Sequence, residues 1–400
     1  MQKLISLSLF LVMHTLRVLS IVLSYVLRKK SYQKQSIVFL ESLPTENAGY
    51  HYRAKLWSDL FLKNEMHAAV WTIIEDRKVW DVQFRKNTQL FLLKALLKRF
   101  IQVIQSRKFA TVIVRRELLV FNDYGNLFLE KFLLSIHPNV ILDFDDDISS
   151  AKNQPREINN TYGKLMLEHG NKFNASLQLY HRFIVASTYL KDKVLRVNSG
   201  LPEKNVLVIP TCVDYDKHLK KSYPAEFDQL VLGWIGSDYN YFLIDQLLPV
   251  LNRLSEQYPF KLLVIGGSEY QRETNFEIAF IPWQLKTEIE NLYKIDVGLM
   301  PLVNDAESRG KGGFKLIQYM GLGIVSIASA ITINCEIIDH EVNSILAKEI
   351  NDWDIFLEKI FNGEYDLRNM GQAAREKIQK GYSFESNKTK YMTFVSANPF

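Results

Sequence analysis

Residues 296–329 read DVGLMPLVNDAESRGKGGFKLIQYMGLGIVSIAS, and this stretch decides the prediction of the fold. A short apolar run ends at Pro301 and a polar loop follows. The glycines and cations of residues 309–315 then lead into a helical pattern before a second apolar run at 324–328. Short runs rich in Val, Ile and Leu that alternate with longer amphipathic stretches are typical of parallel strands joined by helices. The stretch therefore predicts one strand-helix-strand unit of an α/β domain.

The same pattern recurs along the chain and predicts two sheets of six strands each. The first sheet is expected from residues 36–40, 68–72, 110–114, 140–144, 182–186 and 206–209. The second is expected from residues 230–235, 261–265, 277–281, 296–300, 324–328 and 344–347. Residues 212–229 are polar, contain Pro224 and lack a sustained period, which favours a linker. The predicted fold class is α/β, with two Rossmann-like domains that face each other across a cleft.

Composition and charge narrow the class of protein. The chain has 400 residues, of which 47% are hydrophobic and 23% charged, as in folded proteins of two or three domains. Its formal net charge is +5, but the first 35 residues carry these basic residues and no acidic one: Lys3, Arg17, Arg28, Lys29, Lys30 and Lys34. The remainder is close to neutral, which argues against nucleic-acid binding and favours an anionic membrane surface as partner of one end.

The two cysteines, Cys212 and Cys335, are far apart in the sequence. Neither has a nearby His or Cys at the spacing of metal ligands, so neither a disulfide framework nor a zinc site is predicted. This usage suits a reducing compartment.

Residues 4–27 are almost all apolar, and a helix of that length could cross a bilayer core of about 30 Å. Polar residues at helical spacing instead favour a helix that lies in the membrane interface: Ser6, His14, Arg17, Ser20, Ser24 and Arg28. A buried core helix is a third alternative. A cleaved signal is disfavoured because Arg17 interrupts the apolar run and residues 28–30 are basic. On either membrane alternative, this basic cluster should stay on the cytoplasmic side.

The loop at residues 309–315 has the composition of a diphosphate site. Glycine lets backbone N–H groups approach an anion closely, and a helix N-terminus adds partial positive charge. Arg309, Lys311 and Lys315 add full charges, although a solvated basic loop is the simpler alternative. Gly236 and Ser237 follow the expected strand at 230–235 and could face the same ligand, but tight packing explains a glycine there equally well.

Two loops of the first half carry further polar groups. Residues 143–147 place four carboxylates at a strand end, where contact with an acceptor or structural hydrogen bonding is favoured over a Mg²⁺ or Mn²⁺ site. The loop at 41–53 is expected to line the same cleft. Its His51 and Arg53 are candidates for catalysis, although a lone histidine is more often structural.

In order along the chain, these motifs resemble the bacterial family 4 retaining glycosyltransferases of GT-B fold, within glycosyl transferases group 1. The resemblance is strongest to a branch associated with lipopolysaccharide and other surface polysaccharides, and it covers nearly all of the chain after residue 35. Its landmarks are Ala48-Gly49, Arg116-Glu117 before a helix expected at Gly125, residues 143–146, 209–214, 233–237 and 296–302, and, as the most specific, residues 311–320.

The resemblance implies different binding roles for the two halves of the chain. The second half would bind a UDP- or GDP-linked nucleotide-sugar, and the first half a lipid-linked saccharide or glycan acceptor, at the cytoplasmic face of the bacterial inner membrane. Transfer would retain the anomeric configuration and need no obligatory cofactor or metal.

Expected domains are an N-terminal membrane-associated helix at 1–35, an acceptor-side domain at 36–222 and a nucleotide-sugar domain at 223–380. A C-terminal helix at 381–400 would pack back on the first domain.

The same resemblance assigns roles to particular residues. Catalysis is assigned to Asp145, Asp146 and Lys315. Donor binding is assigned to Gly236, Ser237, Arg309, Lys311, Gly312, Gly313, Phe314, Lys315 and Gln318. Acceptor contact is assigned to Ala48, Gly49, His51, Arg53 and Arg116, and no residue is assigned to a metal.

The sequence also departs from the family pattern. The wider family often carries two glutamates seven residues apart, where this chain has Gly310 and Gln318. Nothing at residue 310 can replace a carboxylate, whereas Gln318 can still bond a ribose hydroxyl. Two alternatives therefore remain: a catalytically silent GT-B scaffold in a glycan-assembly complex, and a nucleotide-sugar epimerase of the same fold.

Overall fold

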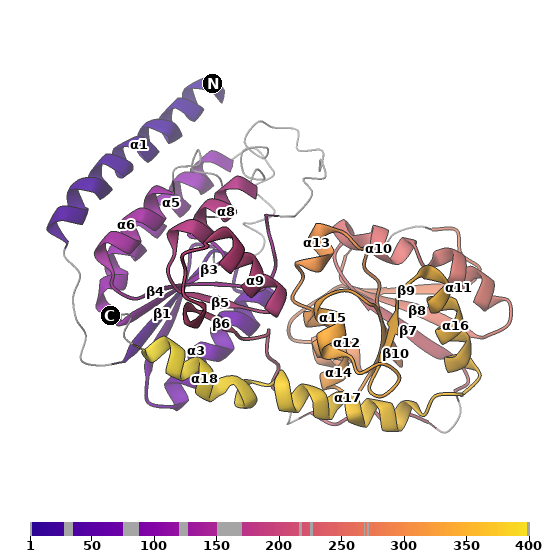
Figure 1. Ribbon diagram of the computed structural model, residues 1–400. Helices are drawn as coiled ribbons and strands as arrows, with labels where there is room; N and C mark the ends of the chain where they lie inside the picture. The colour runs from indigo at the N-terminus through magenta and orange to yellow at the C-terminus, as the bar shows by residue number, and fades with distance from the viewer. Residues whose placement is uncertain are drawn as a thin grey trace. The chain divides into compact units, whose positions relative to one another are not determined.

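The computed structural model describes residues 2–27, 35–74, 88–119, 127–149, 170–215, 218–224, 227–267, 269 and 272–397. Contacts divide the chain into two compact units, one of residues 1–210 and 388–400 and the other of residues 211–387. Each unit is built on one six-stranded sheet with helices on its faces (Figure 1). The basic cluster at 28–30 and the expected helix at Gly125 lie outside the described residues.

The first sheet has the strand order β2-β1-β3-β4-β5-β6, and every neighbouring pair is parallel. Its strands are β1 (Ser36–Glu41), β2 (His67–Thr72), β3 (Thr111–Arg115), β4 (Val140–Phe144), β5 (Phe183–Val185) and β6 (Val206–Val208). Each strand begins and ends within one residue of its predicted bounds. The chain leaves β1 toward one side of the sheet and β3 toward the other, so the switch point lies between these two strands.

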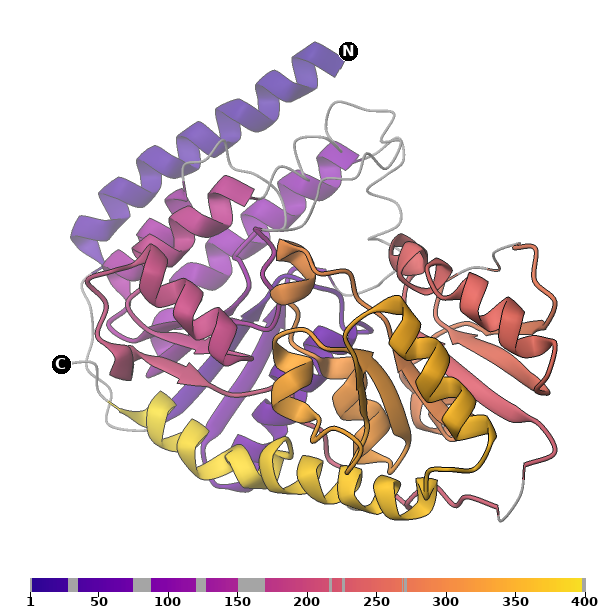
Figure 2. The same cartoon turned by 45° about the vertical axis from the view of Figure 1, so that its right-hand side comes forward.

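Helices cover both faces of the first sheet (Figures 1 and 2). They are α1 (Gln2–Val26), α2 (Ala48–Tyr50), a π-helical turn (His51–Lys55), α3 (Leu56–Lys63), α5 (Thr88–Gln105), α6 (Phe128–Ile136), α8 (Gly170–Leu179), α9 (Thr188–Val197) and the end of α18 (Phe384–Ser396). Helices α5, α6 and α8 lie on one face, and α3 and α18 on the other. Short 3₁₀ turns at Ser106–Lys108 and Glu203–Asn205 precede β3 and β6.

Strand β1 shows why both faces must be covered. Val38 and Leu40 belong to the hydrophobic core shared with α5 and α6, whereas Phe39 stacks on Phe61 of α3 with ring centroids 6.2 Å apart. All six residues of β1 are buried. A continuous apolar run that is buried on both faces is the pattern of a parallel sheet, which confirms the prediction made from the sequence.

The second sheet has the strand order β12-β11-β10-β7-β8-β9 and is also parallel throughout. Its strands are β7 (Leu230–Ile235), β8 (Phe260–Ile265), β9 (Glu277–Ile281), β10 (Val297–Met300), β11 (Val325–Ser329) and β12 (Ile345–Ala347). These bounds again agree with the prediction to within one residue. The order is that of a Rossmann fold, with the switch point between β7 and β10.

The helices of the second unit complete this layered arrangement. They are α10 (Tyr241–Asp245), α11 (Leu248–Ser255), α12 (Glu288–Leu292), α13 (Ala306–Arg309), α14 (Phe314–Gly321), α15 (Ile333–Ile337), α16 (Ile350–Phe361), α17 (Leu367–Gly381) and the start of α18, with a 3₁₀ turn at Asp238–Asn240. Trp234 of β7 lies in a core shared with α10, α11 and α16. Helices α14 and α17 contact each other.

The division between the units falls after Pro210, earlier than the boundary at residue 222 expected from the sequence. The reason is that the following residues are tied to the second sheet. The Nζ atom of Lys221 lies 2.8 Å from Asp296, and the Tyr223 hydroxyl accepts a hydrogen bond from the Val325 amide at 2.9 Å. The polar stretch after Pro210 therefore packs as part of the second unit.

Helix α1 forms over the range expected for the N-terminal helix, but its polar residues do not make one exposed stripe. Ser20 is buried, and its hydroxyl donates to the Arg17 carbonyl at 2.7 Å. Met13 and Leu16 are buried as well, so one side of α1 packs on the first unit. No helix in the described part of the chain is both long and apolar enough to cross a membrane.

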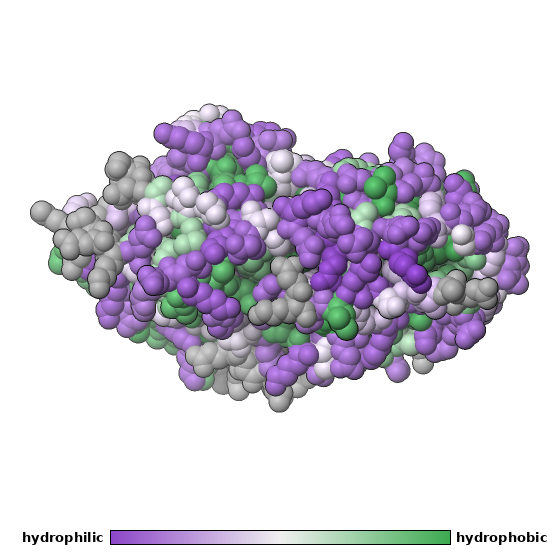
Figure 3. Space-filling model, turned by 90° about the horizontal axis from the view of Figure 1, so that it is seen from below, coloured by the Kyte–Doolittle hydropathy of each residue, from purple (hydrophilic) through white to green (hydrophobic). Residues whose placement is uncertain are grey.

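The face of the molecule shown in Figure 3 has an ordinary surface. The face seen from below in Figure 3 is mostly hydrophilic, and its hydrophobic residues form separate patches. Scattered hydrophobic side chains of this kind are normal on proteins and need no partner.

Removing the Tyr391 ring of α18 should destabilise the first unit. The ring lies 4.2 Å from Trp57 and 5.4 Å from Phe61, centroid to centroid, and is fully buried. We expect Tyr391→Ala to lower the free energy of unfolding by about 3–5 kcal/mol in denaturant titrations. The exposed neighbour Thr389 supplies the control Thr389→Ala, which should change it little. Equal losses in both variants would contradict this packing.

Candidate functional site

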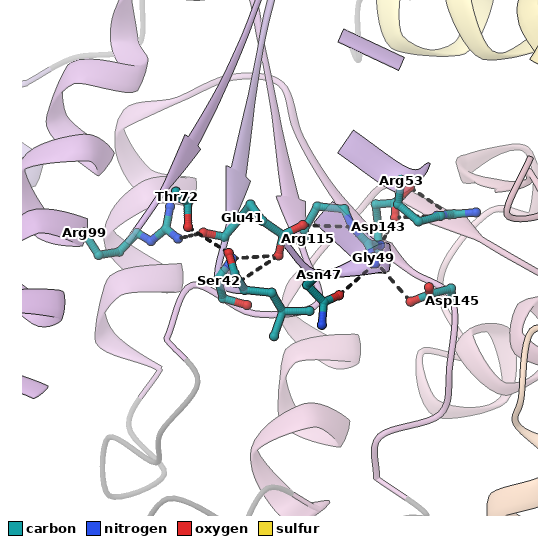
Figure 4. Close-up of polar contacts among 11 residues, drawn as sticks. Glu41, Ser42, Asn47, Gly49, Arg53, Thr72, Arg99, Arg115, Asp143 and Asp145 are labelled. Carbon is teal, nitrogen blue, oxygen red and sulfur yellow. Dashed lines mark hydrogen bonds and ion pairs between the residues drawn. The ribbon is translucent and has the colours of Figure 1, made fainter. Parts of the chain in front are cut away.

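Charged side chains gather at the carboxyl ends of β1, β3 and β4, beside the switch point of the first sheet (Figure 4). Glu41 is the last residue of β1, Arg115 the last of β3, and Asp143 lies near the end of β4. None of the three is more than 1% exposed. Buried charges are costly unless they are paired, so their partners define this part of the molecule.

Asp143 is the centre of the cluster. Arg53 donates to its two carboxylate oxygens, from Nε at 3.2 Å and from Nη2 at 2.9 Å. Arg115 donates to the same carboxylate and, at 3.1 Å, to the Asp143 carbonyl. The remaining Arg53 nitrogen, Nη1, donates to the Ile209 carbonyl at 2.6 Å.

Arg53 therefore does not have the open position expected of an acceptor contact. Its side chain is 1% exposed, and each of its nitrogens donates to a protein oxygen. The physical reason is the neighbouring Asp143, a buried carboxylate that Arg53 and Arg115 pair with together. Arg53 thus positions the ends of β4 and β6 relative to the turn at His51–Lys55.

Asp145 extends the cluster to the surface. Its carboxylate lies 3.3 Å from Arg115 Nη2, and its side chain is 21% exposed. Burial acts to raise the pKa of Asp145, but the positive charges of Arg115, Arg53 and Arg116 outweigh it, so the pKa is lowered. Asp145 is therefore ionised at neutral pH. It can accept hydrogen bonds from a hydroxyl, but it is a weak base.

The other carboxylates of the aspartate cluster have separate surroundings. Asp146 is exposed, whereas Asp147 is buried and pairs with Lys193 at 2.5 Å. In the described part of the chain, no group of three or more His, Cys, Asp or Glu side chains could hold a metal ion. Ion pairs and hydrogen bonds thus account for Asp143, Asp145 and Asp147.

Glu41 and Arg115 were not singled out from the sequence. Glu41 accepts hydrogen bonds from the amides of Ser42 at 2.8 Å and Leu43 at 3.0 Å, and its Oε2 lies 3.5 Å from Arg115 Nε. Burial raises the pKa of Glu41, although Arg115 acts against it. The sequence signal that could have found them is that each is a charged residue at the end of an apolar run.

The loop after β1 lies against this cluster. Asn47 caps α2 by accepting the Gly49 amide at 2.7 Å. A Cβ added to Gly49 would lie 3.0 Å from Asn47 Oδ1 and 3.7 Å from Arg115 Nη2. Ala48 is half-buried beside it. His51 is also half-buried, and burial lowers its pKa, so it is neutral at neutral pH.

Arg116 follows the cluster in a strained conformation. Its φ is 58°, in the left-handed region that non-glycine residues seldom adopt. The Arg116 amide donates to the Asp143 carbonyl at 2.8 Å, which holds this turn against β4. Its Nε atom is buried and has no hydrogen-bond partner among the residues that the structure describes. Strain of this kind is concentrated at functional sites.

In the second unit, Gly236 and Ser237 follow β7 at the switch point. A Cβ on Gly236 would lie 2.2 Å from the Trp234 ring, so this position requires glycine for packing. The structure thus supplies a packing reason for this glycine. Ser237 is exposed, and its carbonyl accepts the Asn240 amide at 2.8 Å.

The glycine-rich loop after β10 leads directly into α14. Gly312 and Gly313 are buried, and Gly313 has a φ of 68°, where a Cβ would lie 2.9 Å from Ile337. Phe314 and Lys315 form the first turn of α14 and are half-buried. Lys315 Nζ lies 5.0 Å from the centroid of the Trp234 ring, which places this cation beside the end of β7.

The three cations predicted to act together have different partners. Arg309 is exposed and its guanidinium donates to Asn304 at 3.3 Å, whereas Lys311 lies 3.6 Å from the Glu307 carboxylate. Their surroundings are set by α13, which is a helix of four residues between the strand and the glycines. Of these three cations, Lys315 is the one that lies beside the switch point.

Gln318 and Tyr319 connect α14 to the sheet. Gln318 is 1% exposed, and its Nε2 has no hydrogen-bond partner in the part of the chain that the structure describes. The fully buried Tyr319 hydroxyl accepts the Ile235 amide at 2.9 Å. Trp234 and Tyr319, which hold α14 beside β7, were not predicted as site residues because their roles depend on contacts distant in sequence.

Comparisons with known proteins agree with this architecture. Residues 229–362 match the family described as Glycosyl transferases group 1. The chain is similar to a Rickettsia africae glycosyltransferase at 15% identity and a TM-score of 0.59, covering 91% of this chain and 98% of that one. It is also similar to sucrose-phosphate synthase from Thermosynechococcus elongatus, at 14% identity and a TM-score of 0.63, covering 91% and 100%.

A further similar structure is Anabaena HepE in complex with UDP-glucose, at 13% identity and a TM-score of 0.60, covering 90% of this chain and 100% of HepE. The two parallel-sheet α/β units are consistent with the GT-B fold. This fold and the group 1 domain together support a GT-B glycosyltransferase. Comparison of the sequence with curated proteins finds no match.

Removing Asp143, the centre of the buried cluster, should destabilise the first unit. Asp143→Ala leaves Arg53 as an uncompensated buried charge and removes one of the three carboxylates that face Arg115, and we expect a loss of about 3–5 kcal/mol in the free energy of unfolding. The exposed pair Lys55–Asp59 is a matched control, because Lys55→Ala should cost less than about 1 kcal/mol. Denaturant titrations measure both, and a small loss in Asp143→Ala would contradict the central role of this carboxylate.

The lowered pKa of Asp145 predicts how stability depends on pH. A carboxyl group with a lowered folded-state pKa contributes stability above its unfolded value of about 3.9, and this contribution is lost as the pH falls through the folded value. The stability difference between wild type and Asp145→Asn should therefore be largest near neutral pH and shrink in acid. A difference that stays constant from neutral pH to acid in unfolding titrations would refute the assignment.

Proposed function

We propose that this protein is a glycosyltransferase that moves a sugar from a UDP- or GDP-linked nucleotide-sugar to a lipid-linked saccharide or surface glycan. One observation carries the proposal. The N-terminus of α14, with two buried glycines before it and Lys315 in its first turn, lies at the switch point of the second sheet. This position belongs to the segment that matches glycosyl transferases group 1.

The first turn of α14 has the groups needed to bind a diphosphate. The backbone N–H groups at the N-terminus of a helix carry partial positive charge. Gly312 and Gly313 let an anion approach them, and Lys315 adds a full charge. When the glycosidic bond to the diphosphate breaks, negative charge grows on the leaving group. Groups that stabilise this charge accelerate the reaction as well as bind the donor.

Gln318 is proposed to bind a hydroxyl of the donor. A buried amide nitrogen without a partner is costly, and a ligand oxygen would satisfy it. Gly236, Ser237, Arg309, Lys311 and Phe314 are proposed to complete the donor side. The support for these five is their place on the segments that directly follow β7 and β10.

Acceptor binding is proposed for the loops at the switch point of the first sheet. Asp145 and Asp146 can accept a hydrogen bond from an acceptor hydroxyl and so orient it. Arg116 has a strained backbone and an unpartnered Nε in the described part of the chain, so it is proposed to contact the acceptor. Ala48, Gly49 and His51 are proposed to line the same loops.

The finer assignments follow the motifs of the sequence. Retention of anomeric configuration, membership of family 4 and a role in lipopolysaccharide or other surface polysaccharides are proposed from residues 311–320 and the other landmarks. Location at the cytoplasmic face of the bacterial inner membrane is proposed from the apolar and basic N-terminal segment. No cofactor is included, because GT-B glycosyltransferases need no obligatory one.

The test is a panel of UDP- and GDP-sugars with the purified full chain, following thermal stabilisation and release of nucleoside diphosphate with and without bacterial lipid extract. We expect one donor to raise the melting temperature and to release nucleotide only when the acceptor lipid is present. Stabilisation without release would favour the silent scaffold, and conversion of the donor into another nucleotide-sugar would favour the epimerase.

Variants of Lys315 identify the diphosphate site. Lys315→Ala should weaken binding of UDP or GDP by at least about tenfold and lower transfer by more, because the lost charge also acts in the transition state. Lys315→Arg should retain part of both. The exposed Lys380 provides the control Lys380→Ala. Normal nucleotide binding by a folded Lys315→Ala protein would remove this residue from the site.

A further inference from the structure

Helix α1 is apolar on two opposite sides, and only one of them is covered. The covered side consists of residues spaced by three and four: Met13, Leu16, Ser20 and Leu23, with Leu27 directly after the helix. These pack on the core of the first unit, where α1 contacts α5 and α6. Spacing by three and four places these residues on one face of the helix.

The outward side of α1 carries large hydrophobic side chains exposed by 41% to 81%, with the exposed polar side chains of His14 and Thr15 among them. The hydrophobic side chains are Phe10, Leu11, Val18, Leu19, Ile21, Val22, Tyr25 and Val26. Helix α5, which contacts α1, adds three more, Leu90, Leu97 and Ile101, exposed by 40% to 56%. We name these eleven side chains the apolar face.

This concentration is unusual within the molecule. The described part of the chain exposes seventeen large hydrophobic side chains, and the apolar face accounts for eleven of them. Soluble proteins seldom expose large contiguous apolar patches to water. Such patches mark sites of contact with a protein or a membrane. The face therefore needs a partner.

The charges near the apolar face favour an anionic lipid surface over a protein. Neither α1 nor α5 contains an Asp or Glu. Arg17 and Lys94 are exposed on these helices, and Lys98 is half-buried. Basic side chains beside an apolar face attract the helix to anionic headgroups.

Hydroxyl groups on α1 do not oppose entry into lipid. Thr15 donates to the Leu11 carbonyl at 2.8 Å, and Ser24 donates to the Ile21 carbonyl at 2.6 Å. A hydroxyl that is bonded to its own helix backbone loses less when water is removed. The outward side can thus enter the region between headgroups and acyl chains.

We propose that the apolar face binds the protein to an anionic membrane, with α1 lying flat in the interface and its inner side held on the first unit. A spanning helix would need lipid on all sides, whereas Met13, Leu16 and Ser20 are buried in protein. This proposal rests on the membrane location given in the proposed function and adds the surface, its orientation and the part played by α5.

The test is co-sedimentation of the full chain with vesicles of phosphatidylcholine alone or mixed with phosphatidylglycerol. Wild type should bind the anionic vesicles, and less so at high salt. Val18→Glu with Val22→Glu should lower the partition coefficient by about tenfold or more, because carboxylates replace apolar groups on an anionic surface. The milder pair Val18→Ser and Val22→Ser should lower it in the same direction, and Leu97→Glu with Ile101→Glu tests α5.

The matched control is Val342→Glu with Ile350→Glu, which changes two exposed hydrophobic residues of the second unit and should leave binding unchanged. Circular dichroism and melting curves show that each variant folds. Unchanged partition of the folded Val18 and Val22 variants would overturn the proposal. So would a wild-type dimer in sedimentation equilibrium that these variants dissociate while no vesicle is bound.

The test of the apolar face and the test of the proposed function can fail independently of each other. Vesicle binding by a protein that no nucleotide-sugar stabilises would leave the apolar face standing and remove the glycosyltransferase. Transfer to the lipid acceptor in detergent, without vesicle binding, would do the reverse.

Discussion

Parallel pairing of every strand is the constraint on which both sites depend. When all six strands of a sheet run in one direction, their carboxyl ends meet at one edge, and the connections must return over the faces as helices. The loops that follow the strands then lie together, however far apart they are in the sequence. Glu41, Arg115 and Asp143 meet in this way in the first unit, and β7 meets α14 in the second.

The buried charges of the first unit lie together because the carboxyl ends of β1, β3 and β4 are neighbours. Asp143 alone would be costly in the interior, and so would Arg53 or Arg115 alone. Together they fix the ends of β3, β4 and the chain at Ile209, because each guanidinium has donors that point in defined directions. Positive charge from the same arginines keeps Asp145 ionised at the surface. The cluster thus links the stability of the unit to the electrostatics of its candidate acceptor loops.

In the second unit, packing rather than ion pairs positions the candidate site. Trp234 fills the space above Gly236 and also lies under Lys315, while Tyr319 bonds the backbone of β7. These contacts fix the start of α14 relative to the switch point without any buried ion pair among them. Because a helix N-terminus attracts anions over a short range, its position decides whether the glycines before it can serve a diphosphate.

The elements and their order could be predicted from the sequence, because the alternation of apolar runs and amphipathic stretches depends on local spacing alone. All twelve strand predictions agree with the structure to within one residue, and the glycines before α14 were recognised from composition. Which charged residues are partners could be seen only in the folded chain. Arg53 was predicted at an acceptor surface and is instead buried against Asp143, 90 residues away. Only the folded chain shows that Ser20 of α1 faces the protein, since a helix is oriented by what packs against it. Ion pairs and packing between distant segments depend on how the strands are ordered in space. The hydrophobic periodicity of the sequence does not specify that order.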